Sequence, residues 1–291
     1  NLTILDLPAA FWRQWIEDIS NQDIELSQDI RFYLTGGESI SAEHLKIWAK
    51  KASANAQWLV SYGPTETTVG ATTFCISNQQ SKDNLFEQLP LGDRLSNVCI
   101  YLLSPTLEAV PVSVNGTIFI GGAGVSRGYL SDPATTAENF IPDPFSNVAG
   151  ARMYCSRDLA YYTTQGDLKF LGRFDNQIKV RGFRVDPVEI ENTLIKHPSI
   201  VKAIVTFSEV ASDKSLVAHF IKQPGATPTP AELWDFVNAT LPKHMCPDYF
   251  VEIEEIPISK NGKVDTASLP KQMQAMHVSV LNLKRLKQRL K

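Results

Sequence analysis

The chain has 291 residues, of which 43% are hydrophobic and 20% are charged, and its formal net charge is −3. This is the composition of an ordinary globular protein with room for two domains. The slight negative charge argues against a nucleic-acid partner, because proteins that bind nucleic acids usually present a basic face. No apolar run is long enough to span a bilayer, so no membrane partner is expected.

The N-terminus and the cysteines bear on the origin of the chain and its compartment. Cys75, Cys99, Cys155 and Cys246 are far apart and form neither a metal template nor a disulfide framework. We therefore expect a reducing cytoplasm. The first residues lack an initiator Met and a basic-then-apolar signal pattern, so we expect the chain to be cut from a longer protein.

Helical and extended patterns alternate over the first sixty residues. Residues 8–20 carry apolar side chains at helical spacing behind a proline, and residues 41–51 do so behind the helix cap Ser41. Residues 31–35 and 57–60 have the pattern of buried strands. This alternation is typical of an α/β fold.

The pattern becomes β-rich from residue 90 to 172 and mixed after Gly172. Apolar runs at 98–103, 116–120 and 160–162, separated by Gly, Pro, Asn and Asp, predict a small β-rich subdomain. Beyond it we expect helices over 188–196 and 231–241 and strands over 201–207 and 216–221, in a compact α+β domain. A solvated helix is expected over 283–291.

One polar segment, residues 61–68, could recognise a nucleotide. Tyr62 can stack on a base and offer its hydroxyl. Thr65 and Thr67 can donate hydrogen bonds to phosphate oxygens, and Glu66 can hold a hard cation such as Mg²⁺. A polar loop that follows a strand would have the same composition, so the segment alone leaves both interpretations open.

Two glycine-containing segments are further candidates. Gly36-Gly37-Glu38 follows a buried strand, at the edge of an α/β sheet where ligands usually bind. Its glycines let a ligand approach the backbone closely. Residues 121–130 are glycine-dense, and we favour a turn with packed backbones over a phosphate loop, because no helix N-terminus clearly follows.

Charged residues complete the set of candidates. Asp158 could accept both hydroxyls of a ribose. Residues 172–184 carry several basic side chains, including Arg173, which could bind anions or simply form a solvated strand face. Lys263 follows an Asn-Gly pair, so it lies at a hairpin tip or on a turn that is able to swing.

In this order and combination, the segments resemble the adenylation domains of non-ribosomal peptide synthetases, within the superfamily of adenylate-forming enzymes. The resemblance runs from residue 3 to Lys263. The sequences at 62–66, 124–130 and 172–184 fit the peptide-synthetase branch better than the acyl-CoA ligase branch. The resemblance implies the carboxyl-terminal part of a large core domain over 1–172, a small mobile domain over 173–272, and a tail over 273–291 toward a carrier domain.

The resemblance also implies an activity. A carboxylic acid, such as an amino acid, would attack the α-phosphorus of ATP to give an acyl-adenylate. The acyl group would then pass to the phosphopantetheine thiol of a carrier protein, in the company of neighbouring synthetase modules. Glu66 would hold Mg²⁺, and Lys263 would bridge the substrate carboxylate and the ribose side of the nucleotide. The residues implied for ATP binding are Gly37, Glu38, Tyr62, Thr65, Asp158, Phe170 and Arg173.

Further roles follow from the same resemblance. Asp175 matches the hinge of the mobile domain, and Lys179 and Gly182 match the loop that serves thioester formation. The residues that match the substrate pocket are Leu34, Gly36, Ser61, Val69 and Gly70. The two glycines among them could equally be there for backbone packing.

Departures from the family pattern keep alternatives open. The family's phosphate loop and the segment that binds the substrate amino group would precede residue 1, so we expect this chain alone to be inactive. Arg157 replaces a glycine before the ribose aspartate, and Val188 replaces a glycine before Glu189. A non-catalytic scaffold of the same fold and an acyl- or aryl-CoA ligase are the alternative functions.

Overall fold

The structure is a computed structural model that describes residues 2–22, 24–38, 40, 42–78, 80, 88–175, 177–180, 183–210, 213–258, 264–270 and 276–277. The chain divides into two compact units, Asn1–Asp175 and Asn176–Lys291. This division is close to the predicted domain boundary after residue 172. The mixed α/β fold predicted from the sequence is confirmed, with helices and several sheets in the described chain.

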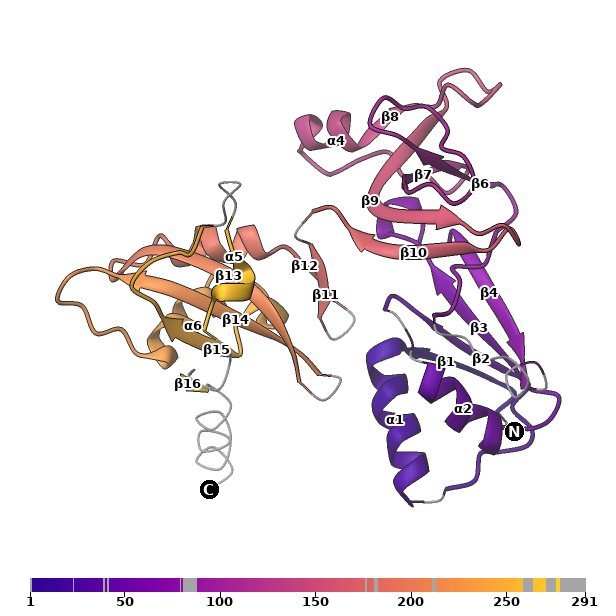
Figure 1. The fold of residues 1–291 in the computed structure, drawn as a ribbon, viewed down its shortest axis with the longest axis horizontal. Coiled ribbons are helices and arrows are strands. Elements are labelled where there is room, and N and C mark those ends of the chain that lie inside the picture. The colour runs from indigo at the N-terminus through magenta and orange to yellow at the C-terminus, as the bar shows by residue number, and fades with distance from the viewer. Residues whose placement is uncertain are drawn as a thin grey trace. The chain divides into compact units, whose positions relative to one another are not determined.

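The first unit begins with an α/β layer (Figure 1). Strands β1 (Ile4–Pro8), β2 (Phe32–Gly36) and β3 (Gln57–Tyr62) are parallel, and β4 (Thr72–Ser77) and β5 (Asp93–Arg94) continue the sheet in antiparallel pairing. Helices α1 (Ala9–Gln22) and α2 (Ala42–Lys51) connect the parallel strands and share one core with them. Because β2 and β3 run in the same direction, Gly36 and Ser61 are paired at one edge of the sheet.

A cluster of aromatic side chains fixes this layer. Trp12 on α1, Trp48 on α2, and Tyr33 and Trp58 on the strands are all fully buried. Their ring centroids are 4.4 to 5.8 Å apart, within the range of favourable aromatic pairs. The predicted helices 8–20 and 41–51 are thus confirmed, and their apolar faces pack on the sheet.

The β-rich part of the first unit is an antiparallel sheet in the order β10-β9-β7-β6. Its strands are β6 (Val98–Leu103), β7 (Gly116–Gly122), β9 (Arg152–Tyr162) and β10 (Leu168–Arg173), and β8 (Phe140–Pro142) pairs with β9. A register shift between Phe170 and Gly172 marks a β-bulge, after which Arg173 lies directly opposite Asp158.

The short helix α4 (Pro133–Asn139) was not predicted from the sequence. Asp132 caps it by accepting a hydrogen bond from the Thr135 backbone N–H, and Pro133 occupies the first turn. Both features are typical helix-start signals. They are not accompanied by a long apolar stripe, which is why the periodicity did not reveal this helix.

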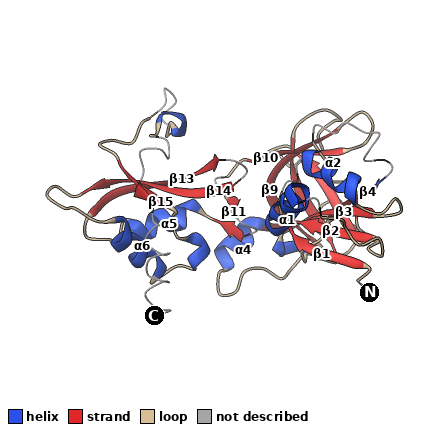
Figure 2. Cartoon of the chain, turned by 90° about the horizontal axis from the view of Figure 1, so that it is seen from below, coloured by secondary structure: helices blue, strands red, loops and turns tan. Residues whose placement is uncertain are grey.

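The second unit has its own sheet and core. A hairpin of β11 (Ile178–Val180) and β12 (Phe183–Val185) precedes a sheet of β13 (Ile200–Val210), β14 (Asp213–Lys222), β15 (Tyr249–Glu252) and β16 (Met276–His277). Helices α5 (Pro187–Leu194) and α6 (Pro230–Asn238) lie along one face of this sheet (Figure 2). The α+β character predicted after Gly172 is confirmed, and the predicted helix over 283–291 lies outside the described residues.

The predicted tail over 273–291 is described in part. Met276 and His277 form β16, which pairs with Tyr249 and Phe250. These two residues therefore belong to the sheet of the second unit. In the part of the chain that the structure describes, no helix is both long enough and apolar enough to cross a bilayer.

Candidate functional site

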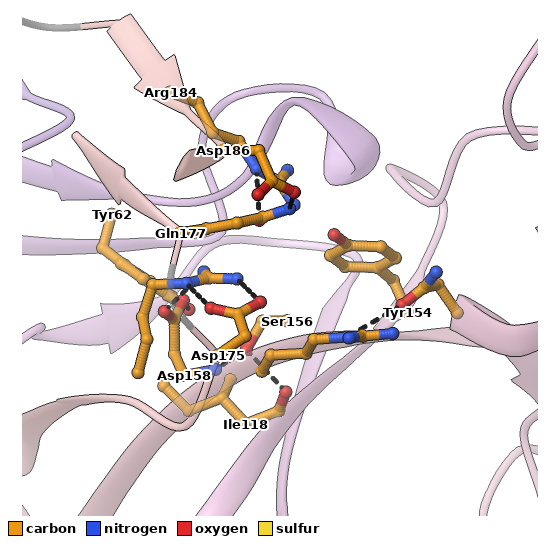
Figure 3. Close-up of polar contacts among 12 residues, drawn as sticks. Tyr62, Ile118, Tyr154, Ser156, Asp158, Asp175, Gln177, Arg184 and Asp186 are labelled. Carbon is orange, nitrogen blue, oxygen red and sulfur yellow. Dashed lines mark hydrogen bonds and ion pairs between the residues drawn. The ribbon is translucent and has the colours of Figure 1, made fainter. Parts of the chain in front are cut away.

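Asp158 is the centre of a buried polar cluster in the first unit (Figure 3). The Tyr62 hydroxyl donates a hydrogen bond of 2.5 Å to its Oδ2 atom. The Arg173 Nη1 group donates one of 2.8 Å to its Oδ1 atom. Asp158 is only 5% exposed. The cluster therefore joins the end of β3 to the paired strands β9 and β10.

Arg173 is shared between two carboxylates. Its Nε and Nη2 groups donate hydrogen bonds of 2.7 and 2.8 Å to the two carboxylate oxygens of Asp175 (Figure 3). Such a bidentate arrangement fixes a guanidinium in direction as well as in position. Arg173 is thus aimed at Asp158 by a partner only two residues away.

Tyr62 acts as a donor in this cluster. Burial first, and then the neighbouring Asp158 carboxylate, raise the pKa of Tyr62 well above its ordinary value, so its phenol keeps its proton at neutral pH. The Tyr62 ring also packs against the apolar core of the β-rich sheet. Ser156 fixes the backbone of Asp158. The Ser156 hydroxyl accepts a hydrogen bond from the Asp158 backbone N–H and donates one to the Ile118 carbonyl.

A second carboxylate, Glu66, lies on the short 3₁₀ turn Thr65–Thr67 that follows β3. Glu66 is 7% exposed, and its Oε1 atom accepts a hydrogen bond of 2.7 Å from the Tyr129 hydroxyl. Burial and the neighbouring Tyr154 and Glu66 raise the pKa of Tyr129, which keeps it a donor. Thr65 is exposed at the same turn, and the Thr67 hydroxyl donates to the Pro64 carbonyl.

The chemistry of Glu66 fits a magnesium ion held together with phosphate groups. Within the described residues no cluster of three or more His, Cys, Asp or Glu side chains could hold a metal by itself. Mg²⁺ usually binds one or two protein carboxylates and completes its shell with water and substrate phosphates. One buried carboxylate beside exposed Thr65 suits that mode of binding.

Gly36 and Gly70, two of the residues expected to line a substrate pocket, both lie close to a third, Ser61, near the end of β3. A Cβ atom at Gly36 would lie 2.8 Å from the Ser61 carbonyl oxygen, and one at Gly70 would lie 3.5 Å from the Ser61 hydroxyl. Leu34 is half-buried on β2, two residues before Gly36. Val69 is 72% exposed and has a φ of 69°, which is unusual for a β-branched residue.

Glu38 and Gly37 lie in the turn after β2. The Glu38 side chain is 1% exposed and forms an ion pair of 2.6 Å with Arg13 of α1. Its carboxylate therefore ties the turn to the helix. Gly37 is exposed, has a φ of 90°, and has open space where a side chain would stand. The backbone at Gly37 is thus the accessible part of this turn.

The glycine-dense segment 121–130 packs its backbone closely, as the sequence predicted. A Cβ atom at Gly122 would lie 2.2 Å from the Asn97 carbonyl oxygen, and one at Gly124 would lie 2.9 Å from that of Thr67. A helix does follow this segment, because α4 begins at Pro133, contrary to the sequence-based expectation. The favoured interpretation as packed backbone is nevertheless confirmed at these two positions.

The two internal departures from the family pattern, Arg157 and Val188, are accommodated locally. Arg157 has a φ of 63°, a left-handed conformation that glycine adopts most easily. Its guanidinium bonds to Glu138 and Asn139, at 2.5 and 3.2 Å. Val188 lies in the first turn of α5 with 45% of its surface exposed, and its backbone N–H bonds to the cap Asp186. Arg157 leaves the contacts of the neighbouring Asp158 with Tyr62 and Arg173 in place.

The remaining predicted site residues are Phe170, Lys179, Gly182 and Lys263. Phe170 is half-buried on β10, where it pairs with Ala160. The backbone of Lys179 belongs to β11 in the second unit, and its side chain is not described. Gly182 and Lys263 lie outside the described residues.

Sequence reasoning assigned no role to three residues that hold the site together. They are Arg13, which binds Glu38, Tyr129, which binds Glu66, and Arg152, whose guanidinium bonds to the Ser126 and Arg127 carbonyls. Arg13 and Arg152 are charged residues on otherwise ordinary elements, so the local pattern carries no signal for them. Tyr129 lies in the segment that carries the family resemblance, and that position was the available signal.

Comparison with known proteins identifies the relatives of this chain. Two family models match the chain: AMP-binding enzyme over residues 1–130, and AMP-binding enzyme C-terminal domain over residues 189–263. A solved structure of a holo NRPS protein containing adenylation and PCP domains, bound to a vinylsulfonamide inhibitor, is also similar. It has a TM-score of 0.75 at 25% identity, and the match covers 91% of this chain and 44% of that one.

Two curated relatives are large synthetases. The chain is 35% identical over 271 residues to Gramicidin S synthase 2 of Brevibacillus brevis, covering 93% of this chain and 6% of that protein. It is 36% identical over 271 residues to Tyrocidine synthase 1 of Brevibacillus parabrevis, covering 92% of this chain and 23% of that protein. The chain thus spans only a small part of the length of these relatives. It belongs to the AMP-binding enzyme family, among the adenylation domains of the non-ribosomal peptide synthetases.

Proposed function

We propose that the intact protein activates an amino acid or a related carboxylic acid with ATP and loads it onto the phosphopantetheine thiol of a carrier protein. A carboxylate oxygen of the substrate attacks the α-phosphorus, and the bond to pyrophosphate breaks. The thiol then displaces AMP from the acyl-adenylate. The observation that carries the proposal is the buried Asp158, held between the Tyr62 hydroxyl and the Arg173 guanidinium.

We infer that this cluster binds the nucleoside part of ATP. Asp158 accepts hydrogen bonds from two different elements in this structure, so its oxygens are directed by Tyr62 and Arg173. A fixed carboxylate of this kind suits the paired hydroxyls of a ribose. The Tyr62 ring offers an aromatic face to adenine. Gly37 would approach the base through its exposed backbone, and Phe170 would flank the ribose.

The turn around Glu66 would face the phosphates. Thr65 would donate its hydroxyl to a phosphate oxygen, and Glu66 would bind Mg²⁺. When bound, Mg²⁺ neutralises phosphate charge and polarises the phosphoryl group under attack. Glu66 contributes one negative charge. Because Glu66 is largely buried, its attraction for Mg²⁺ would be stronger than that of a carboxylate on the open surface.

The acid substrate would bind at the ends of β2 and β3. A side chain at Gly36 would clash with the Ser61 carbonyl oxygen, and one at Gly70 would contact the Ser61 hydroxyl. Leu34 adds an apolar group on the same face of β2 as Gly36. We propose that these residues and Val69 form one wall of the pocket. The residues of the opposite wall would then determine which substrate binds.

The second unit would supply the mobile part of the cycle. By motif match, Lys263 provides a positive charge when the adenylate forms, and the loop that contains Lys179 and Gly182 serves the thioester step. Asp175 would be the hinge, and the division of the chain directly after this residue supports that role. Hinges are commonly a few loop residues that absorb backbone rotation.

The partners follow from the same assignment. We propose a carrier domain, reached through the segment after residue 272, and neighbouring synthetase modules. The solved NRPS protein to which the chain is similar contains adenylation and PCP domains, which supports a carrier partner. All four cysteines are free thiols, which supports the reducing cytoplasm as the compartment.

The test is acid-dependent exchange of pyrophosphate into ATP by the intact protein, with a panel of amino, hydroxy and aryl acids. At least one acid should stimulate exchange, and Asp158→Asn should reduce it about 100-fold, because a preorganised polar contact to the nucleotide is lost. The matched control is Asp143→Asn. Asp143 is also buried and also accepts a hydrogen bond from a tyrosine, Tyr101, at 3.1 Å, in the same sheet region.

Exchange should survive in the control variant. Equal losses in the Asp158 and Asp143 variants would indicate general damage to the first unit rather than loss of a nucleotide contact. If no acid in the panel stimulates exchange by the intact protein, the proposed activity is contradicted and a non-catalytic scaffold is favoured.

A further inference from the structure

The carboxylate of Glu66 has a tyrosine partner to which nothing in the proposed activity assigns a role. The Tyr129 hydroxyl donates a hydrogen bond of 2.7 Å to Glu66 Oε1, across 63 residues of sequence. Tyr129 is itself 3.5 Å from the Tyr154 hydroxyl of β9. Glu66 is therefore linked through Tyr129 to the same strand that carries Asp158.

The backbone around Tyr129 also holds the turn of Glu66. The Ser126 N–H donates a hydrogen bond of 2.9 Å to the Glu66 carbonyl. The Thr68 hydroxyl donates one of 2.8 Å to the Gly124 carbonyl. The segment from Gly124 to Tyr129 thus contacts the turn through backbone and side chain together, and Tyr129 supplies the contact to the carboxylate.

Tyr129 is held firmly on its other sides. Its ring meets the Phe140 ring edge-on, with centroids 5.5 Å apart. Its backbone N–H donates a hydrogen bond of 2.9 Å to the Thr136 hydroxyl of α4. Arg152 holds the same segment through a hydrogen bond of 2.9 Å to the Ser126 carbonyl. Because these contacts fix the Tyr129 hydroxyl in place, its hydrogen bond favours one orientation of the Glu66 carboxylate.

We propose that Tyr129 is a positioning residue that holds the Glu66 carboxylate in the orientation needed to bind the divalent cation. The proposal rests on the proposed function, in which Glu66 is the metal ligand. A glutamate has several rotatable bonds, and a hydrogen bond to one oxygen reduces the conformations that the other oxygen can sample. The glycine-dense segment 121–130 would serve this purpose by bringing Tyr129 to the turn.

The experiment measures binding of Mn²⁺, a paramagnetic substitute for Mg²⁺, to the intact protein with α,β-methylene-ATP, by electron paramagnetic resonance. Tyr129→Phe removes the donor and keeps the ring that packs on Phe140. The apparent dissociation constant for Mn²⁺ should rise about tenfold, as is typical when a partner of a metal ligand is lost. Affinity for the nucleotide without metal should stay within experimental error of the wild type, and the thermal midpoint should fall no further than in a variant that loses another buried tyrosine–carboxylate hydrogen bond.

The matched control is Tyr101→Phe, which removes a tyrosine–carboxylate hydrogen bond of 3.1 Å to Asp143 in the same unit. It should leave Mn²⁺ binding unchanged. Equal effects of the two variants, or wild-type Mn²⁺ affinity in Tyr129→Phe, would overturn the proposal.

A third variant tests the role of Tyr129 separately from the assignment of Glu66 as the metal ligand. Glu66→Gln should weaken Mn²⁺ binding strongly, and adding Tyr129→Phe to it should cause no further loss. If Glu66→Gln binds Mn²⁺ normally, then the assignment of Glu66 as the ligand is wrong. If only Tyr129→Phe behaves as wild type, then the assignment of Glu66 stands and the role of Tyr129 is wrong.

Discussion

Single residues in this chain adopt conformations that their chemistry does not favour. Arg157 is the clearest case, because it has a φ of 63° where the family resemblance leads one to expect glycine. A side chain in the left-handed region costs roughly 1 kcal/mol or more. Part of that cost is offset by the contacts of its guanidinium with Glu138 and Asn139.

Replacement of Arg157 separates these two contributions. Arg157→Gly should leave the free energy of unfolding close to that of the wild type, because relief of strain offsets the lost ion pair. Arg157→Ala keeps the strain and loses the contacts, so it should be about 1 kcal/mol less stable than the glycine variant. Urea denaturation of both variants measures the difference. Equal stabilities would show that the backbone at this position is not strained.

His219 makes a separate prediction about pH. It is 2% exposed on β14, its Nε2 atom is 3.0 Å from the Thr206 hydroxyl, and burial lowers its pKa from 6.5 to about 4. Between these values the unfolded chain binds a proton that the folded chain does not. Stability should therefore fall as the pH drops from about 6.5 to about 4, by on the order of 3 kcal/mol, with no effect of this group at higher pH.

The measurement is the unfolding free energy at pH 7 and pH 5, together with an NMR titration of the His219 ring. His219→Leu should remove this part of the pH dependence. A ring that titrates near 6.5 in the folded protein would contradict the low pKa expected for this buried histidine.

At the scale of elements, the sequence predicted those with strong periodicity and missed those defined by pairing. The apolar faces of α1 and α2 were evident because Trp12, Ile16, Leu45 and Trp48 recur at helical spacing. Strand β4 was not predicted, because Thr72–Ser77 has a mixed composition. It forms a strand by pairing with β3. Pairing between distant segments leaves little trace in local sequence.

The candidate site shows the same limit. Tyr62, Glu66, Asp158 and Arg173 could be chosen from their motifs, and their roles stay predictions. In the structure, Asp158 accepts hydrogen bonds from both Tyr62 and Arg173. Their orientation could not be predicted, because it depends on a bulge before Gly172 that sets which residue of β10 faces Asp158. Local composition does not specify a register shift of this kind.

The bulge gives a prediction for β10. Gly172 has a φ of 128°, and a Cβ atom there would meet no neighbour within 4 Å, so only backbone strain opposes a side chain. Gly172→Ala should cost about 1–3 kcal/mol and weaken nucleotide binding, because the strained backbone directly precedes Arg173. Isothermal titration with the nucleotide and urea denaturation measure the two effects.

A second glycine provides the control for this experiment. Gly166 lies between β9 and β10, has a φ of 91°, and also has open space for a Cβ atom. Gly166→Ala should cost stability and leave nucleotide affinity unchanged. Equal losses of affinity in the two variants would argue against a specific role of the bulge in placing Arg173.

At the scale of the whole molecule, the two half-reactions should depend on different groups. Lys263→Ala should lower the rate of adenylate formation by several hundredfold, because loss of one preorganised positive charge costs about 3–4 kcal/mol in the barrier. Transfer of the acyl group from a supplied adenylate to the carrier thiol should change little. Pyrophosphate exchange and carrier loading, assayed separately, measure the two steps.

The control comes from the same stretch of sequence. Lys260→Ala removes an equal charge three residues earlier and should leave both steps near wild type. Equal loss of both half-reactions in the Lys263 variant would contradict the assignment of Lys263 to adenylate formation alone.

The most direct test of the central claim is a crystal structure of the intact protein with a non-hydrolysable acyl-adenylate analogue. We predict that the Asp158 carboxylate lies within hydrogen-bond distance of the ribose hydroxyls, with adenine against the Tyr62 ring. An analogue bound elsewhere, with Asp158 still enclosed by Tyr62 and Arg173 and away from the ribose, would contradict it.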